Sequence, residues 1–137
     1  PPRSTLFPYT TLFRSLENVL MPAELMGVGH SAKSRAMELF EYVNLTERMD
    51  HFPSQLSGGE RLRVAVLRAL INTPDIILTD EPTGNLDAGN AERILELFTK
   101  ICRDFHQAMV ITTHDQHVAS IGSRRCRLEN GTLLVIT

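Results

Sequence analysis

Two short strand-like runs, each leading to charged or imidazole side chains, constrain the fold of this chain more than any other feature. The apolar run 76–78 leads to Asp80 and Glu81, and the predicted buried strand 109–113 leads to His114. Between them, Asp87 can cap a long helix. Strand, helix and strand in this order predict a parallel pair buried on both faces, with both carboxyl ends at one edge of an α/β sheet. We therefore expect the acids and the imidazole to lie side by side.

The elements flanking the second run follow from spacing and turn chemistry. The helix after Asp87 has apolar residues at helical intervals, and we expect these to be its buried face: Ile94, Leu95, Phe98, Ile101 and Phe105. Residues 124–129 and 132–136 alternate around Asn130-Gly131, two residues that tolerate a positive φ. This pattern predicts a C-terminal β-hairpin.

A glycine pair marks a second site of interest. Leu56-Ser57-Gly58-Gly59-Glu60 precedes a helix-patterned run whose predicted apolar face is Leu62, Ala65, Val66, Ala69 and Leu70. Glycines at a helix N-terminus let backbone N–H groups approach an anion closely, which suits phosphate binding. The alternative is that Ser57 is only a helix cap and the glycines only interrupt the chain.

The order of these motifs resembles that in the ATP-binding subunit of ABC transporters. Residues 56–60 resemble the family's signature motif, residues 76–81 its Walker B strand, residues 84–87 its D-loop and His114 its H-loop histidine. The stretches 16–19, 80–87 and 124–133 most resemble the subfamily that serves lipoprotein-release and macrolide exporters. The implied fold class is α/β: part of the ABC ATPase form of the P-loop NTPase fold, with a helical subdomain, part of the parallel sheet and the C-terminal hairpin.

The resemblance also implies chemical roles. Glu81 would orient and polarise the attacking water, Asp80 would hold Mg²⁺ through water, and His114 would reach the γ-phosphate of ATP. Asp87 would communicate between two sites of a dimer. The signature would act in trans on ATP held by a second subunit through Ser57, Gly58, Gly59 and Glu60. The implied cofactors are ATP and Mg²⁺.

Partners and location are likewise implied by the resemblance. We expect a transmembrane permease and a homodimer or a paired ATPase subunit, at the cytoplasmic face of the inner membrane and peripheral to it. The formal net charge of −2 gives no argument for nucleic acid. No run of about 18 apolar residues is present, so membrane association is expected only through the permease.

The segment before the signature is predicted to be helical. Ser15 is expected to cap a first helix with Leu16, Val19, Leu20 and Ala23 on its apolar face, and Pro22 to kink or end it. Ser31 is expected to cap a second helix, whose buried residues are predicted to be Ala36, Leu39, Phe40 and Val43. Residues 44–55 form a connector with a possible short helix capped by Thr46. We assign 16–55 to a helical subdomain and 56–137 to the part from the signature to the hairpin.

Two observations predict that the chain is the C-terminal part of a longer domain. The string Gly-x-x-x-x-Gly-Lys-Ser/Thr of a P-loop does not occur in the 137 residues, so we expect it upstream of Leu16. Thr5 to Ser15 matches one reading frame of a common sequencing adapter, so we expect residues 1–15 to be non-native; the alternative is a genuine, loosely ordered segment. The parent protein is expected to be an ATPase and this chain alone to be inactive. Two alternatives stay open: a truncated remnant that binds an intact partner, and a non-transport ABC ATPase.

Overall fold

The computed structural model describes residues 11–136. These divide into two compact units that meet in the chain between Ile77 and Leu78. Most of the segment that we predict to be adapter-derived, residues 1–10, lies outside the described residues, and its origin stays a prediction. Among the described residues, no helix combines the length and the apolar character needed to cross a membrane.

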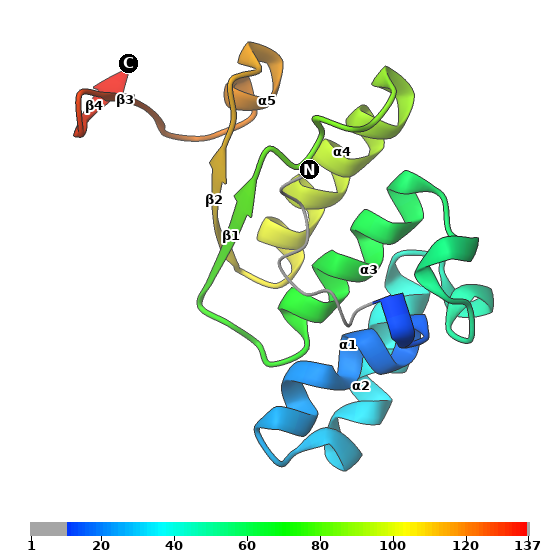
Figure 1. The fold of residues 1–137 in the computed structure, drawn as a ribbon. Coiled ribbons are helices and arrows are strands. Elements are labelled where there is room, and N and C mark those ends of the chain that lie inside the picture. The colour runs from blue at the N-terminus through cyan, green and yellow to red at the C-terminus, as the bar shows by residue number, and fades with distance from the viewer. Residues whose placement is uncertain (1–10, 137) are drawn as a thin grey trace. The chain divides into compact units, whose positions relative to one another are not determined.

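The first unit is built mainly from three α-helices, α1 (Ser15–Leu25), α2 (Gly29–Tyr42) and α3 (Gly58–Leu70). Each of these helices packs against the other two, and Figure 1 shows them side by side. Two 3₁₀ turns, η2 (Thr46–Arg48) and η3 (Pro53–Gln55), lie in the connector between α2 and α3. The predicted apolar face of α2 is confirmed by burial: Ala36, Leu39, Phe40 and Val43.

The start of α1 differs from the prediction. Arg14 is the N-cap and Ser15 lies inside the helix, where it is fully buried. Both its backbone N–H and its hydroxyl donate to the carbonyl oxygen of His51, each at 2.9 Å. The Ser15 hydroxyl is thus used to join α1 to the connector, while the Glu17 carboxylate accepts the Arg14 N–H at 2.6 Å.

Two further helix boundaries also differ. Of the two predicted effects of Pro22, ending the helix is wrong and a kink stays a prediction: α1 continues to Leu25, because the burial of Val19 and Ala23 offsets the backbone hydrogen bond that proline cannot donate. α2 begins at Gly29, so Ser31 is not its cap; the Ser31 hydroxyl donates to the Val28 carbonyl oxygen at 2.9 Å.

The buried face of α3 is only partly the predicted one. Val66 and Leu70 are buried as expected, whereas Leu62 and Ala65 are half-buried and Ala69 is exposed. Val64 and Leu67 are buried in their place. The reason is that α3 contacts both α1 and α2, which turns a second row of its side chains inward.

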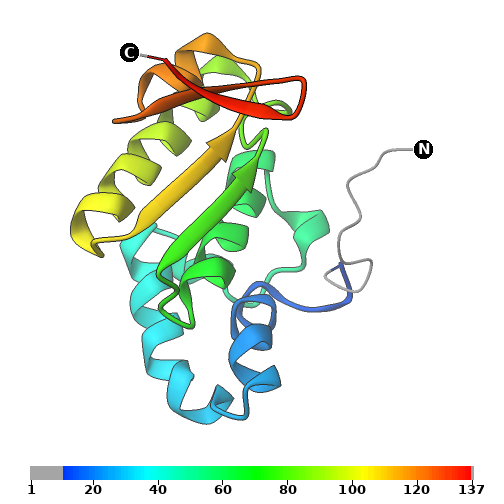
Figure 2. The same ribbon diagram turned by 90° about the vertical axis from the view of Figure 1, so that its left-hand side faces the viewer.

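Two sheets of two strands each follow, and the boundary between the units falls inside the first of these strands. Strand β1 (Ile76–Asp80) lies next to β2 (Ala108–Thr112), and the long helix α4 (Ala88–Asp104) joins them. The two arrows point the same way in both views (Figure 1, Figure 2), as the strand–helix–strand order predicts. On α4, burial confirms Ile94, Leu95, Phe98 and Ile101, while Phe105 is half-buried at the helix end.

The strands are not buried on both faces, contrary to the prediction. Ile77 is 4% exposed, but its neighbours Ile76 and Leu78 are 55% and 76% exposed. β2 alternates in the same way between exposed and half-buried residues. Val110 on β2 is likewise 51% exposed, so in the described part of the chain no element covers this face of the sheet.

The C-terminal segment confirms the predicted hairpin. Strands β3 (Arg125–Glu129) and β4 (Thr132–Ile136) pair antiparallel, with Glu129 opposite Thr132. Asn130 and Gly131 have φ of 49° and 79°, as a type I′ turn requires. The short helix α5 (Gln116–Ser120) was not predicted; the Asp115 side chain caps it by accepting the N–H groups of His117 and Val118.

Candidate functional site

The signature motif forms the first turn of α3. The Glu60 N–H donates to the Ser57 hydroxyl at 3.2 Å, and the Ser57 N–H donates to the Glu60 carboxylate at 2.8 Å. This reciprocal pair is a capping box. It confirms that Ser57 caps the helix, and it places Ser57, Gly58, Gly59 and Glu60 together at the positive end of the helix dipole.

The charge of Glu60 is offset by Arg48, which sequence reasoning missed. Arg48 is the last residue of η2, and its Nε lies 3.1 Å from Glu60 Oε1 at the N-terminal turn of α3. The Ser57 N–H bond, together with Arg48, lowers the pKa of Glu60. The charged carboxylate of Glu60 therefore lies in the first turn of α3, with the Arg48 guanidinium beside it.

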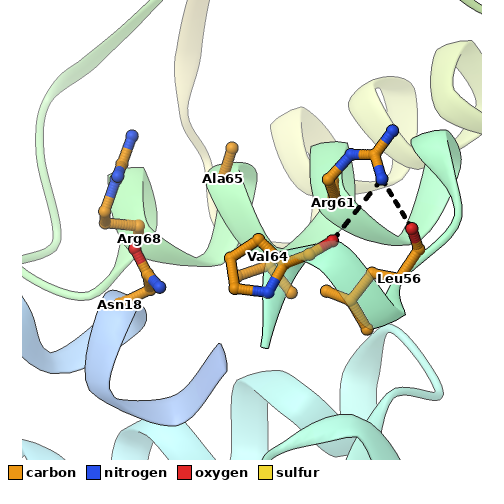
Figure 3. Close-up of a pocket in the computed structure, with 7 residues that line it drawn as sticks. Asn18, Leu56, Arg61, Val64, Ala65 and Arg68 are labelled. Carbon is orange, nitrogen blue, oxygen red and sulfur yellow. Dashed lines mark hydrogen bonds between the residues drawn. The ribbon is translucent and has the colours of Figure 1, made fainter. Parts of the chain in front are cut away.

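Two pockets lie next to the signature in the first unit. One, of about 140 Å³, is lined by Asn18, Pro53, Leu56, Arg61, Val64, Ala65 and Arg68 (Figure 3). In it the Arg61 guanidinium donates to the Leu56 carbonyl oxygen at 2.6 Å, and burial lowers the pKa of Arg68. The other, of about 290 Å³, is lined by Asn44, Leu45, Thr46, Glu47, Arg48, Glu60 and Arg63. Glu60 is the predicted nucleotide-binding residue that reaches a pocket wall.

The predicted acids stand at the carboxyl end of β1 in the second unit. Asp80 is the last residue of the strand and Glu81 follows it in a left-handed conformation, with φ of 45°. The Glu81 N–H donates to the Thr112 carbonyl oxygen at 2.9 Å, which extends the pairing between β1 and β2 by one bond. A non-glycine residue in this region is uncommon and often occurs at functional sites.

Glu81 and His114 lie together, as expected from the strand order. The backbone N–H of His114 donates to Glu81 Oε1 at 2.8 Å, and the ring Nδ1 lies 2.6 Å from the same oxygen. The hydrogen bond from the His114 ring lowers the pKa of Glu81, and the same bond raises the pKa of His114. Both shifts favour the charged forms, so the two residues form an ion pair between the two pKa values.

Two threonines complete this edge of the sheet, and sequence reasoning missed both. The Thr112 hydroxyl donates to Asp80 Oδ1 at 2.5 Å. The Thr113 hydroxyl donates to Glu81 Oε2 at 3.3 Å and accepts the Asp115 N–H at 3.0 Å. The available signal was a pair of hydroxyl residues at the end of the second strand, directly before His114.

The carboxylates of Asp80 and Glu81 can be compared with the ligands that Mg²⁺ prefers. A carboxylate is a hard oxygen ligand that Mg²⁺ prefers, and Mg²⁺ is usually held by one or two carboxylates, waters and substrate phosphates rather than by a protein cage. Among the described residues, no group of three or more histidines, cysteines or acids could hold a metal ion. Asp80 offers one such carboxylate at the exposed end of β1.

Asp87 is placed as a helix cap. Its side chain accepts the backbone N–H of Asn90 at 3.0 Å and the Asn90 side-chain amide at 2.5 Å. These bonds lower the pKa of Asp87. The predicted start of α4 is thus confirmed, while the expected communication between sites stays a prediction.

Comparison with known proteins finds one family and many relatives. The family model described as "ABC transporter" matches residues 2–84. The lipoprotein-releasing system ATP-binding protein LolD of Treponema denticola is 49% identical over 122 residues, which is 88% of this chain and 54% of the relative. The protein of the same name from Bacteroides fragilis is 46% identical over 89% of this chain and 57% of its own length. The chain thus spans about half the length of these curated relatives.

A solved structure shows the same fold. An ATP-binding cassette, determined as a dimer in a post-hydrolysis state with ADP and Pi, superposes with a TM-score of 0.73 at 36% sequence identity. The match covers 93% of this chain and 59% of that one. The likeness confirms the predicted α/β fold class.

Proposed function

The chain belongs to the ABC transporter family, and on that premise we propose that it is part of an ATP-hydrolysing subunit that drives a membrane transporter. The observation that carries the proposal is the meeting of Glu81 and His114, with 2.6 Å between Oε1 and Nδ1, beside Asp80. An acid pair and an imidazole at the carboxyl ends of adjacent strands suit phosphoryl transfer to water.

The proposed roles follow the chemistry of each side chain. Glu81 takes or orients the proton of the attacking water, and hydrogen bonds from His114 lower the pKa of its carboxylate, which favours the charged form. His114, 85% exposed at its side chain, is accessible to a γ-phosphate. Asp80 would hold magnesium, which neutralises charge on the phosphates when bound.

The signature is proposed to act on a second subunit's nucleotide. Ser57, Gly58 and Gly59 lie at the N-terminus of α3, where backbone N–H groups favour phosphate, and Glu60 closes that turn. Asp87 would pass information between the two sites. The related cassette described as a dimer with ADP and Pi supports a paired arrangement.

The relatives support an exporter of the lipoprotein-release type. We propose that the whole protein works beside a transmembrane permease as one of two ATPase subunits, at the cytoplasmic face of the inner membrane. Its attachment there would be through the permease.

The test uses a full-length cassette in which the N-terminal part of the Treponema denticola relative precedes residues 16–137. We expect magnesium-dependent phosphate release from ATP, and its loss on chelation with EDTA. Glu81→Gln should lower kcat by about 100-fold or more, in line with removal of a general base. Glu96→Gln, an exposed change on α4, is the matched control and should leave kcat unaltered. Equal turnover in both variants would refute the assignment of Glu81.

A second measurement separates the ATPase from a remnant that only binds a partner. The 137-residue chain is added to the intact Treponema denticola relative while turnover is followed. Inhibition that saturates with added chain, combined with an inactive full-length cassette, would favour the remnant.

A further inference from the structure

The two acids at the carboxyl end of β1 each contact a threonine at the carboxyl end of β2. The Thr112 hydroxyl lies 2.5 Å from Asp80 Oδ1 and 3.4 Å from the Thr79 carbonyl oxygen, so Asp80 is its nearer acceptor. The Thr113 hydroxyl lies 3.3 Å from Glu81 Oε2. The bond from the Glu81 N–H to the Thr112 carbonyl oxygen, at 2.9 Å, sets this register. A slip of one residue would move each hydroxyl to the opposite face of the sheet and away from its acid.

Thr112 is suited to hold Asp80 in one orientation. Asp80 is exposed, so burial does not restrict its side chain. Threonine is branched at Cβ and has few accessible rotamers, so its hydroxyl is a stiff donor. A short bond to a charged acceptor is also among the stronger hydrogen bonds. The contact occupies Asp80 Oδ1 and leaves the second carboxylate oxygen for another partner.

Thr113 holds Glu81 through a chain of hydrogen bonds. Its hydroxyl oxygen accepts the Asp115 N–H at 3.0 Å, which directs the hydroxyl hydrogen toward the Glu81 carboxylate. The Asp115 side chain in turn accepts the His117 N–H at 2.7 Å at the start of α5. The Glu81 oxygens are therefore divided: His114 binds Oε1 and Thr113 binds Oε2.

We propose that Thr112 and Thr113 are positioning residues that orient the carboxylates of Asp80 and Glu81 for magnesium and water respectively. The inference rests on the proposed function. Neither threonine contacts a reacting atom: each acts through the acid that it holds. Outer-shell hydrogen bonds of this kind change metal affinity or activity by about 10- to 100-fold when removed.

The first test measures orientation directly and needs no turnover. Thr112→Val and Thr113→Val keep the branched shape and remove the hydroxyl; Thr112→Ser and Thr113→Ser keep the hydroxyl. Three-bond NMR couplings report χ1 of Asp80 and Glu81, in the 137-residue chain and in the full-length cassette. We expect one χ1 rotamer in the unaltered protein and both serine variants. In Thr112→Val the couplings of Asp80 should take values averaged over several χ1 rotamers. In Thr113→Val the same should hold for the couplings of Glu81.

The second test follows turnover in the full-length cassette. Thr112→Val should raise the magnesium concentration for half-maximal rate about tenfold, and Thr113→Val should lower kcat about tenfold with KM for ATP unchanged. The serine variants should recover to within about twofold of the unaltered rate. Thr132→Val, on β4 of the hairpin, is the matched control and should change neither value. Dispersed amide spectra identify variants that remain folded.

The outcomes separate this inference from the proposed function. Active cassettes in which both valine variants match the unaltered protein would overturn the inference and leave the proposed function intact. Unchanged couplings in folded valine variants would overturn it as well. An inactive unaltered cassette would instead count against the proposed function, while the couplings would still show whether the threonines orient the acids.

Discussion

His114 contacts a single oxygen of Glu81 through two of its own atoms, with its backbone N–H at 2.8 Å and its ring Nδ1 at 2.6 Å. The His114 side chain is 85% exposed and that of Glu81 38%, so hydrogen-bond geometry rather than burial joins them. The contact links Glu81, directly after β1, to His114, two residues after β2. The charge state of each side chain therefore depends on that of the other.

The first prediction concerns that dependence. Glu81→Gln should bring the pKa of His114 down toward its ordinary value of about 6.5, because the carboxylate that raises it is gone. A histidine whose pKa is raised on folding contributes stability that is complete below about pH 6.5 and is lost as pH rises through the folded pKa. NMR titration of the histidine rings measures the change.

A second histidine pair is the matched control. His117 Nε2 lies 2.8 Å from Glu92, which raises the pKa of His117. Glu92→Gln should therefore lower the pKa of His117 and leave that of His114 unaltered. If the pKa of His114 were the same in Glu81→Gln and in the unaltered chain, the Glu81 carboxylate would not be what raises it.

The second prediction concerns Arg48 at the signature. Arg48→Gln should raise the pKa of Glu60, since the Arg48 contact contributes to its depression. Arg48 is 40% exposed at its side chain, so solvent screening limits the loss of unfolding free energy at pH 7 to about 1 kcal/mol or less. A carboxylate with a lowered pKa contributes stability above about pH 4.3, and this is lost as pH falls through the folded pKa.

Urea unfolding at pH 7 and pH 3 measures this effect. The difference between Arg48→Gln and the unaltered chain should shrink at pH 3, as Glu60 becomes protonated. Arg103→Gln, which alters the exposed contact between Arg103 and Asp104 on α4, is the comparison at a site away from the signature. A Glu60 pKa that does not move in Arg48→Gln would show that the two side chains are not coupled in solution.

The third prediction concerns the cap of α3. Ser57→Ala removes the acceptor for the Glu60 N–H and should cost about 1 kcal/mol of unfolding free energy. Ser57→Asp, also a good N-cap residue, should restore most of it. Ser54→Ala in η3 is exposed and should have little effect. Equal stability of Ser57→Ala and the unaltered chain would mean that the capping box does not stabilise the helix.

The fourth prediction concerns the core of the second unit. Phe98 is 1% exposed on α4, and Phe98→Ala should lower its unfolding free energy by about 3–5 kcal/mol through lost burial and a cavity. Met37→Ala, at a 50% exposed position on α2, should change stability by about 0.5 kcal/mol or less. Denaturant unfolding followed by circular dichroism compares the two. Similar losses for both would contradict the burial assigned to Phe98.

Several elements could be predicted because their causes are local in the chain. Asn130-Gly131 tolerates the positive φ that a tight hairpin needs, and Asp87 caps α4 three residues from its partner Asn90. The acids and His114 could be placed together because strand order alone brings the ends of parallel strands to one edge. Burial on one side of β1 could not be predicted, since it depends on how many strands and helices surround it.

The sequence by itself thus determined the α/β class, the strand ends that carry Asp80, Glu81 and His114, and the capped start of α3. Only the tertiary structure decided which side chains support them. Thr112 reaches Asp80 across 32 positions of the chain, and Arg48 reaches Glu60 across 12. The physical reason is that such contacts depend on register and helix packing between distant segments, and neither propensity nor periodicity records which hydroxyl or guanidinium will face a given carboxylate.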